Sequence, residues 1–192
     1  KTRTLRVGGR VMLNRFGTSL DVGIENIQNH IYFDTKGLPQ QHSGSVQVFS
    51  ARLQQNFRVG ALHWDNSLTY QTSTDENIIT LPKFVVYTNL YATVRIATLR
   101  LQLGIDCNYY TSYYAPAYQP ATATFHQQRD LKLGDYPFMN VYANMKLSKA
   151  RFYVMMSHVN QGWFGGNKYF SALHYPLNPR RLQIGVSVDF AN

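Results

Sequence analysis

The stretch Arg181–Phe190, which reads RLQIGVSVDF, decides the fold of this 192-residue chain. Successive side chains of a β-strand point to opposite faces, so every second residue of this stretch shares a face. One face therefore carries only Leu, Ile, Val and Phe, whereas the other carries Arg, Gln, Gly, Ser and Asp. A transmembrane β-barrel needs this pattern because each strand has lipid on one side and water on the other. Any half-buried strand shows it too, so the interpretation depends on whether the pattern recurs.

The same alternation recurs along most of the chain and predicts about nine antiparallel strands, an all-β fold. A slip in the alternation near Asn26 predicts a β-bulge, and Asn66 interrupts an otherwise apolar face. We expect strands at residues 3–14, 18–33, 44–58, 61–73, 84–96, 99–112, 138–147, 151–160 and 181–190.

The predicted connections alternate strictly between short and long. The short ones lie near residues 15–17, 58–60, 97–98 and 148–150, and the long ones cover residues 34–43, 74–83, 112–137 and 161–179. Short periplasmic turns and long extracellular loops give this asymmetry in up-and-down barrels of the Gram-negative outer membrane. The last strand follows a long loop, so the C-terminus is predicted to be periplasmic. Because bacterial barrels have even strand numbers, nine strands predict that residues 1–192 form the C-terminal portion of a single larger barrel domain.

The composition agrees with a membrane barrel. Charged residues make up only 15% of the chain, against roughly 25% in ordinary soluble domains, and 14 Tyr and 11 Phe could supply aromatic girdles. No run of about 18 apolar residues is present, so the sequence predicts no transmembrane helix. The net charge of +9 comes from scattered bases without a basic block or helix face. This distribution argues against nucleic acid as a partner.

Most charged side chains of the predicted strands fall on the polar faces. A lysine or arginine that faces lipid at the bilayer midplane costs about 2–4 kcal/mol, so these bases should face a water-filled or ion-paired interior. Such charges can either lock neighbouring strands or tune a pore, and the sequence leaves both roles open. The residues expected to line the interior are Arg6, Arg10, Arg52, Asp65, Arg95, Arg100, Asp106, Lys146, Arg151, Arg181 and Asp189, with Asp21 and Glu25 among the acids.

Motifs for catalysis or metal binding are weak. The six histidines lack HxxxH and HExxH spacing, and no GxSxG motif occurs. His63 and Asp65 share a predicted polar face, a spacing more typical of a structural contact. The loop pair Asp75 and Glu76 is not specific for Ca²⁺, and the single cysteine, Cys107, excludes an internal disulfide. We expect no catalytic residue, metal or cofactor.

The C-terminal half, over roughly residues 105–192, resembles a known family. The resemblance rests on LGDYPFMNVY at residues 133–142, MKLSKARF at 145–152, HVNQG at 158–162, HYP at 174–176 and GVSVDF at 185–190. These stretches resemble the C-terminal part of the putative porins of Bacteroidetes, a family of longer outer-membrane barrels. The resemblance implies a barrel and a porin function, and it supplies no catalytic residues.

The sequence therefore predicts a porin-like barrel in the outer membrane that lets small solutes diffuse passively. Three alternatives stay open: the barrel part of an active transporter, a structural or accessory subunit of an outer-membrane assembly, and a soluble lipid-binding barrel. The expected partners are the lipid bilayer and lipopolysaccharide, the remaining strands of the barrel outside this chain, and other outer-membrane proteins.

Overall fold

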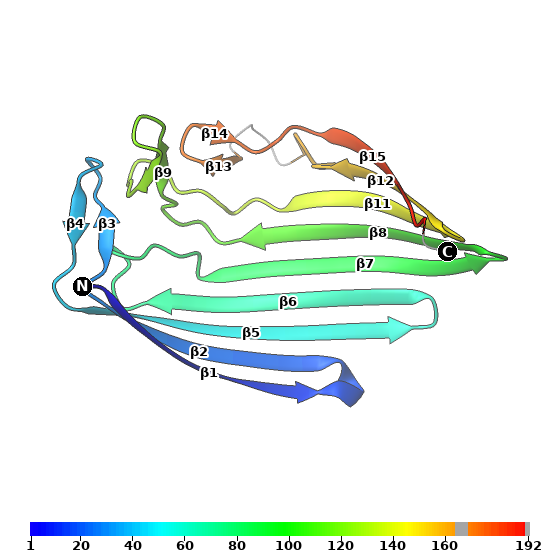
Figure 1. The fold of residues 1–192 in the computed structure, drawn as a ribbon, viewed down its shortest axis with the longest axis horizontal. Coiled ribbons are helices and arrows are strands. Elements are labelled where there is room, and N and C mark those ends of the chain that lie inside the picture. The colour runs from blue at the N-terminus through cyan, green and yellow to red at the C-terminus, as the bar shows by residue number, and fades with distance from the viewer. Residues whose placement is uncertain (164–168, 191–192) are drawn as a thin grey trace.

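The computed structural model describes residues 1–163 and 169–190, and its dominant feature is one antiparallel sheet of nine strands (Figure 1). Each strand pairs with its nearest neighbours along the chain within this sheet, which makes the sheet an up-and-down meander. The strands are β1 (Arg3–Leu13), β2 (Thr18–Gln28), β5 (Ser45–Val59), β6 (Leu62–Ser73), β7 (Phe84–Ile96), β8 (Leu99–Tyr110), β11 (Phe138–Leu147), β12 (Ala150–Ser157) and β15 (Arg181–Val188). The predicted antiparallel all-β fold is confirmed.

The short and long connections lie at opposite ends of the sheet, as the sequence predicts (Figure 1). The first short connection is the single 3-10 turn η1 (Asn14–Phe16), which ends at Gly17 with a φ of 62°. Ala97 and Ser148 open two-residue turns, each with a φ of 52°. Positive φ values match the twist that a tight hairpin requires, so these turns hold consecutive strands in register.

The long connections carry three small hairpins at the other end of the molecule (Figure 1). They pair β3 (Ile31–Phe33) with β4 (Pro39–Gln41), β9 (Ala117–Gln119) with β10 (Thr124–His126), and β13 (Phe170–Ala172) with β14 (Tyr175–Pro176). The stretch at 112–137 and the described part of 161–179 thus contain short strands that the sequence analysis does not predict. Residues 164–168, within the last of these, lie outside the described part of the chain.

Two details of the predicted second strand are wrong. The sequence predicts a strand over residues 18–33, but β2 ends at Gln28 because Asn29 has a φ of 54° and turns the chain out of the sheet. The register of β2 with both neighbours runs through Asn26 without a shift, so the predicted bulge is absent there. The slip in alternation instead marks the point where the chain leaves the sheet for the β3–β4 hairpin.

Much of the apolar face of the sheet is exposed to solvent. One row of this face runs across Val11, Leu20, Leu53, Leu68 and Val86 on five neighbouring strands. At the two edges of the sheet, the relative exposures are 65% for Val7 and 67% for Ile184. By contrast, the buried hydrophobic residues of the described chain are only Val46, Ala115, Ala117, Leu133 and Tyr169. Exposed apolar surface on this scale marks a face that is covered by something other than water.

Asn66, which interrupts the apolar face in the sequence, belongs to a hydrogen-bonded network on that face. The Trp64 indole N–H donates to the Thr88 hydroxyl over 2.8 Å, and that hydroxyl donates to Asn66 Oδ1 over 2.7 Å. The Asn66 amide in turn donates to the Gln55 carbonyl oxygen over 3.3 Å. These polar groups satisfy one another without water, which reduces the cost of placing them on an apolar surface.

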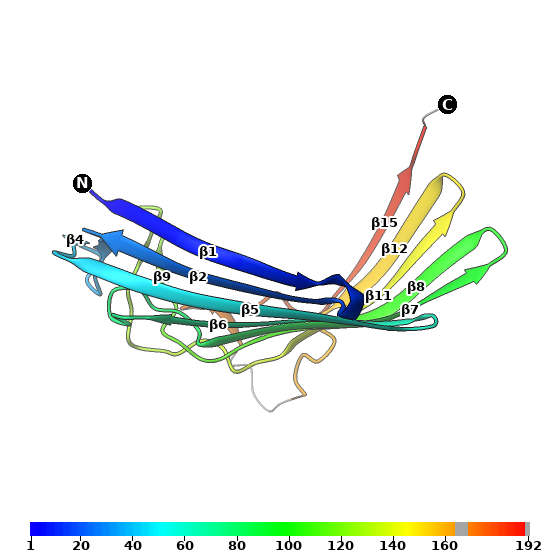
Figure 2. The ribbon, with the colours of Figure 1, turned by 90° about the horizontal axis from the view of Figure 1, so that it is seen from below.

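The sheet is twisted and curved, and its two edge strands are far from each other (Figure 2). In the described chain β1 pairs only with β2, and β15 pairs only with β12. Residues 3–13 pair with residues 18–28 in one continuous register. A closed barrel is not observed, because β1 and β15 each keep one unpaired edge.

The assignment of the two faces predicts opposite effects of the same substitution at neighbouring positions of β15. Ile184→Arg should lower the free energy of unfolding in lipid vesicles by about 2–4 kcal/mol, because the charge would face hydrocarbon. Gln183→Arg should leave it nearly unchanged, because Gln183 points to the polar face. Urea unfolding of the protein in vesicles measures both, and equal stability of the two variants would show that the assignment is wrong.

Candidate functional site: the polar face of the sheet

The centre of the polar face is a hydrogen-bonded row of amides and carboxylates. Asp65, Asn89, Asp106 and Asn140 lie side by side on β6, β7, β8 and β11. The Asn140 amide donates to Asp106 Oδ1 over 2.8 Å, and the Tyr142 hydroxyl donates to Asn89 Oδ1 over 2.9 Å. Because these groups have partners within the sheet, the row is ordered before any solute reaches it.

Two glycines make room for tyrosine rings on this face. A Cβ atom on Gly104 would overlap the ring of Tyr142, and one on Gly185 would overlap the ring of Tyr153. Each glycine is the direct cross-strand neighbour of its tyrosine. The rings therefore lie over the adjacent strand, and the Tyr142 hydroxyl reaches Asn89 two strands away. This explains why the polar faces of β8 and β15 each carry a residue without a side chain.

Acids and bases alternate between strands at the β1 edge of the polar face. Arg10 forms an ion pair with Asp21 on the adjacent strand. Arg52 lies on the other side of Asp21, and Arg6 lies opposite Glu25. Opposite charges across neighbouring strands stabilise their pairing. This corner of the face corresponds to the strand-locking role that the sequence leaves open.

The other half of the face carries a basic row, which we define as Arg95, Arg100, Lys146 and Arg151. The four lie directly opposite one another on β7, β8, β11 and β12, next to the two short turns of these hairpins. Arg151 Nη2 is 3.4 Å from Asp189 Oδ2. Within residues 1–163 and 169–190, the other three bases have no carboxylate within 4.0 Å. Positive charge is thus concentrated at the short-turn end of this half.

The eleven residues that the sequence assigns to the interior lie on the polar face but not in one place. Arg6, Arg10 and Arg52 lie near the β1 edge, Asp65 and Asp106 lie at the centre, and Arg95, Arg100, Lys146, Arg151 and Asp189 lie near the short turns. Arg181 is at the opposite end of β15. The sequence prediction missed Arg58, which lies opposite His63 two residues before the β5–β6 turn. Continued alternation through Val59 would have placed it on this face.

His63 and Asp65 do not form an acid–base pair in the described chain. The imidazole of His63 stacks on the ring of Tyr91, with centroids 4.7 Å apart and an interplanar angle of 5°. No hydrogen bond joins His63 to Asp65 among the described residues. Stacking of this kind is a structural contact, but it joins His63 to Tyr91 rather than to Asp65, its expected partner.

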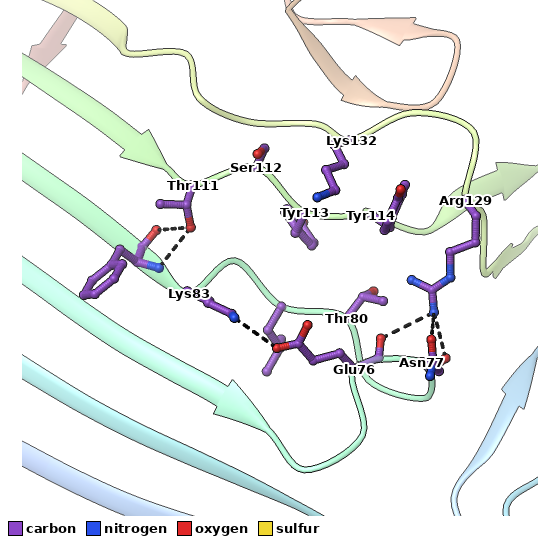
Figure 3. Close-up of a pocket in the computed structure, with 12 residues that line it drawn as sticks. Glu76, Asn77, Thr80, Lys83, Thr111, Ser112, Tyr113, Tyr114, Arg129 and Lys132 are labelled. Atoms are coloured by element: carbon purple, nitrogen blue, oxygen red, sulfur yellow. Dashed lines mark hydrogen bonds and ion pairs between the residues drawn. The ribbon is translucent and has the colours of Figure 1, made fainter.

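A cleft of about 550 Å³ lies at the other end of the sheet, between the loops at residues 74–83 and 111–137 (Figure 3). Lys83 Nζ is 3.3 Å from Glu76 Oε1. Arg129 donates to the Asn77 carbonyl oxygen and to Asn77 Oδ1, both over 3.2 Å, and its guanidinium lies 5.2 Å from the centre of the Tyr114 ring. The hydrogen bonds from Arg129 to Asn77 join the two loops, whereas the Lys83–Glu76 pair and the Arg129–Tyr114 contact each lie within one loop. Glu76, an acid that the sequence offers for Ca²⁺, is thus paired with a lysine of its own loop.

A buried histidine anchors the loops that follow β12. His158 is fully buried; its Nε2 lies 2.7 Å from the Tyr136 hydroxyl and its Nδ1 lies 2.7 Å from the Asn178 carbonyl oxygen. Asn160, also fully buried, accepts a hydrogen bond from the Met139 backbone N–H over 3.1 Å. These residues come from the LGDYPFMNVY and HVNQG stretches that carry the family resemblance. These two stretches therefore contribute to a packed anchor for the loops.

Of the comparisons with known proteins, the one with protein families finds a match. No helix in the described part of the chain is long and apolar enough to cross a membrane. Searches of curated proteins and of solved structures find no match. A protein family described as "Putative porin" matches residues 1–192, which extends the resemblance from the C-terminal half to the whole chain. The chain belongs to this porin family.

Proposed function

We propose that this protein is a porin-like outer-membrane barrel through which small solutes diffuse passively. The observation that supports the proposal is the division of the sheet into an exposed apolar face and a hydrogen-bonded polar face. Its large apolar side chains are exposed on one face, whereas its polar side chains are hydrogen-bonded to one another on the other face. An apolar band outside and a polar lining inside are the defining features of a channel-forming barrel. Family membership supports the same function.

Closure of the barrel requires strands that pair with β1 and β15. Lipid offers no hydrogen bonds to a free strand edge, and each unpaired backbone group there costs several kcal/mol. We propose that further strands of the same barrel, outside these 192 residues, pair with both edges. In this arrangement the apolar face contacts the bilayer and lipopolysaccharide, the hairpins of the long loops are extracellular, and the C-terminus is periplasmic.

The polar face then lines the pore. We propose that the excess of bases over acids on this face sets a mild preference for anions, because the sequence assigns eight bases and five acids to the interior and Arg58 adds a ninth base. The nucleophile and metal motifs that an enzyme would need are weak in the sequence, so we propose a transport function rather than catalysis.

One observation favours a second candidate, a structural or accessory subunit with a covered lumen. The loop at residues 111–137 is hydrogen-bonded to two other long connections. The Gln127 backbone N–H donates to the Phe33 carbonyl oxygen over 2.9 Å, and the Gln127 side chain donates to the Ile78 carbonyl oxygen over 3.1 Å. Loops joined in this way could cover one end of the barrel and leave it closed to solutes.

Conductance separates the two candidates. The full-length protein in planar bilayers should form open channels whose reversal potential in a KCl gradient shows mild anion preference, because fixed positive charge favours anion entry. Absence of any conductance would favour the accessory subunit. Clear cation selectivity would contradict the assignment of the basic residues to the pore.

Hydrogen exchange tests the proposed closure. In the membrane-inserted full-length protein, the backbone amides of β1 and β15 should exchange as slowly as those of the central strands β6 and β7, because all are then paired on both sides. Rapid exchange confined to the outer edges of β1 and β15 would contradict the presence of partner strands. The loop hairpin β3–β4 supplies an internal reference for fast exchange.

A further inference from the structure

The basic row has an arrangement that is unfavourable without a ligand. Neighbouring strands lie about 4.8 Å apart, and like charges directly opposite each other destabilise a sheet. Arg95, Arg100, Lys146 and Arg151 nevertheless occupy consecutive strands in one register. Within the described chain only Arg151 is near a carboxylate, that of Asp189. Three adjacent cations therefore lack a counter-charge from residues 1–163 and 169–190.

The rest of the polar face shows that this is not a general property of the sheet. Arg10 is paired with Asp21, and Arg52 lies opposite the same acid. On the half that holds the basic row, the next row of cross-strand neighbours contains Thr93, Gln102, Asn144 and Tyr153. The side chains of Gln102 and Asn144 are hydrogen-bonded over 3.0 Å. These neighbours are neutral, so they do not compensate the basic row.

The surroundings of the row can hold a small solute. A cavity of about 540 Å³ lies over this part of the sheet, and its lining includes Arg100, Lys146 and Arg151 together with Gln102, Asn144 and Ser187. This volume lies within the range of about 300–1,000 Å³ that is typical of small-molecule sites. The lining offers three of the four bases of the row, without Arg95, together with neutral hydrogen-bonding groups and the apolar residues Met145, Phe152 and Val186.

We propose that the basic row is a binding site for solutes with several negative charges, in particular phosphate-bearing solutes. The planar fork of a guanidinium matches the oxygens of phosphate and binds them with two parallel hydrogen bonds. Adjacent cations at strand spacing favour an anion with several charges over chloride, because each added charge meets another base. The row lies on the face opposite the apolar one, so a soluble phosphate compound rather than a lipid headgroup reaches it.

The inference rests on the proposed pore function and locates its anion preference at four residues. It also predicts that the bases at the β1 edge contribute little to the anion preference. The three arginines near the β1 edge, Arg6, Arg10 and Arg52, carry a comparable charge on the same face but have Asp21 and Glu25 on the neighbouring strand. They serve as a matched control for the removal of three positive charges.

The experiment measures how inorganic tripolyphosphate reduces chloride conductance. Full-length protein in bilayers of zwitterionic lipid is compared with a row variant, Arg95→Gln with Arg100→Gln and Lys146→Gln, and a control variant, Arg6→Gln with Arg10→Gln and Arg52→Gln. Tripolyphosphate should block the natural protein at millimolar concentration. The half-blocking concentration should rise at least about tenfold in the row variant and less than about threefold in the control.

The possible outcomes distinguish this inference from the proposed function. Equal effects of the two variants, or open channels that tripolyphosphate does not block, would overturn the basic row as the site while leaving the pore intact. Absence of chloride conductance in the natural protein would overturn the pore function. In that case calorimetric titration of tripolyphosphate into the detergent-solubilised protein and the row variant still decides whether the row binds. If the triple variant fails to fold, Lys146→Gln alone should raise the half-blocking concentration, and no rise would contradict the proposal.

Discussion

The structure depends on one constraint: in a hydrocarbon environment every backbone N–H and C=O group must be hydrogen-bonded within the protein. A meander of nine antiparallel strands meets this need for its seven inner strands, since each is paired on both sides. The side chains then divide between two environments. Leu, Val and Ile cover one face at high exposure, and even the polar cluster of Asn66, Thr88 and Trp64 on that face is internally hydrogen-bonded. In place of a core between two layers, the sheet has one face suited to lipid and one suited to water.

On the polar face, the two halves of the sheet differ in how their charges are paired. Ion pairs such as Arg10–Asp21 join strands near β1, whereas the basic row gathers positive charge on β7 to β12. The first arrangement stabilises the sheet, and we propose that the second acts on solutes. Above them, the His158 anchor and the contacts of Arg129 fix the long loops at one end. Strand pairing, pore chemistry and loop order are thus handled by different residues.

The sequence predicts the sheet well because period-two alternation and connection length are local properties of the chain. Nine strands, their order and the facing of residues such as Ile184 follow from them. Features that depend on contacts across strands could not be predicted. The slip near Asn26 is indistinguishable from a bulge until the left-handed Asn29 is seen. The fit of Tyr142 over Gly104 and the alignment of Arg95, Arg100 and Lys146 depend on register, which alternation alone does not give. Arg58 is missing from the predicted interior because the sequence analysis begins the turn at residue 58, whereas β5 continues to Val59.

The central claim is that one face of the sheet meets lipid and the other meets water. Its most direct test is a single-cysteine scan of β11 in the full-length protein inserted in a membrane. Cys107 is the only cysteine of the chain, so Cys107→Ser gives a background without thiols within it. Each position from Phe138 to Leu147 is then changed to Cys and exposed to a water-soluble, membrane-impermeant thiol reagent. The account predicts labelling at every second position, at Asn140, Tyr142, Asn144 and Lys146, with protection at the positions between them. Uniform labelling along β11, or labelling at Val141 and Ala143 instead, would contradict it.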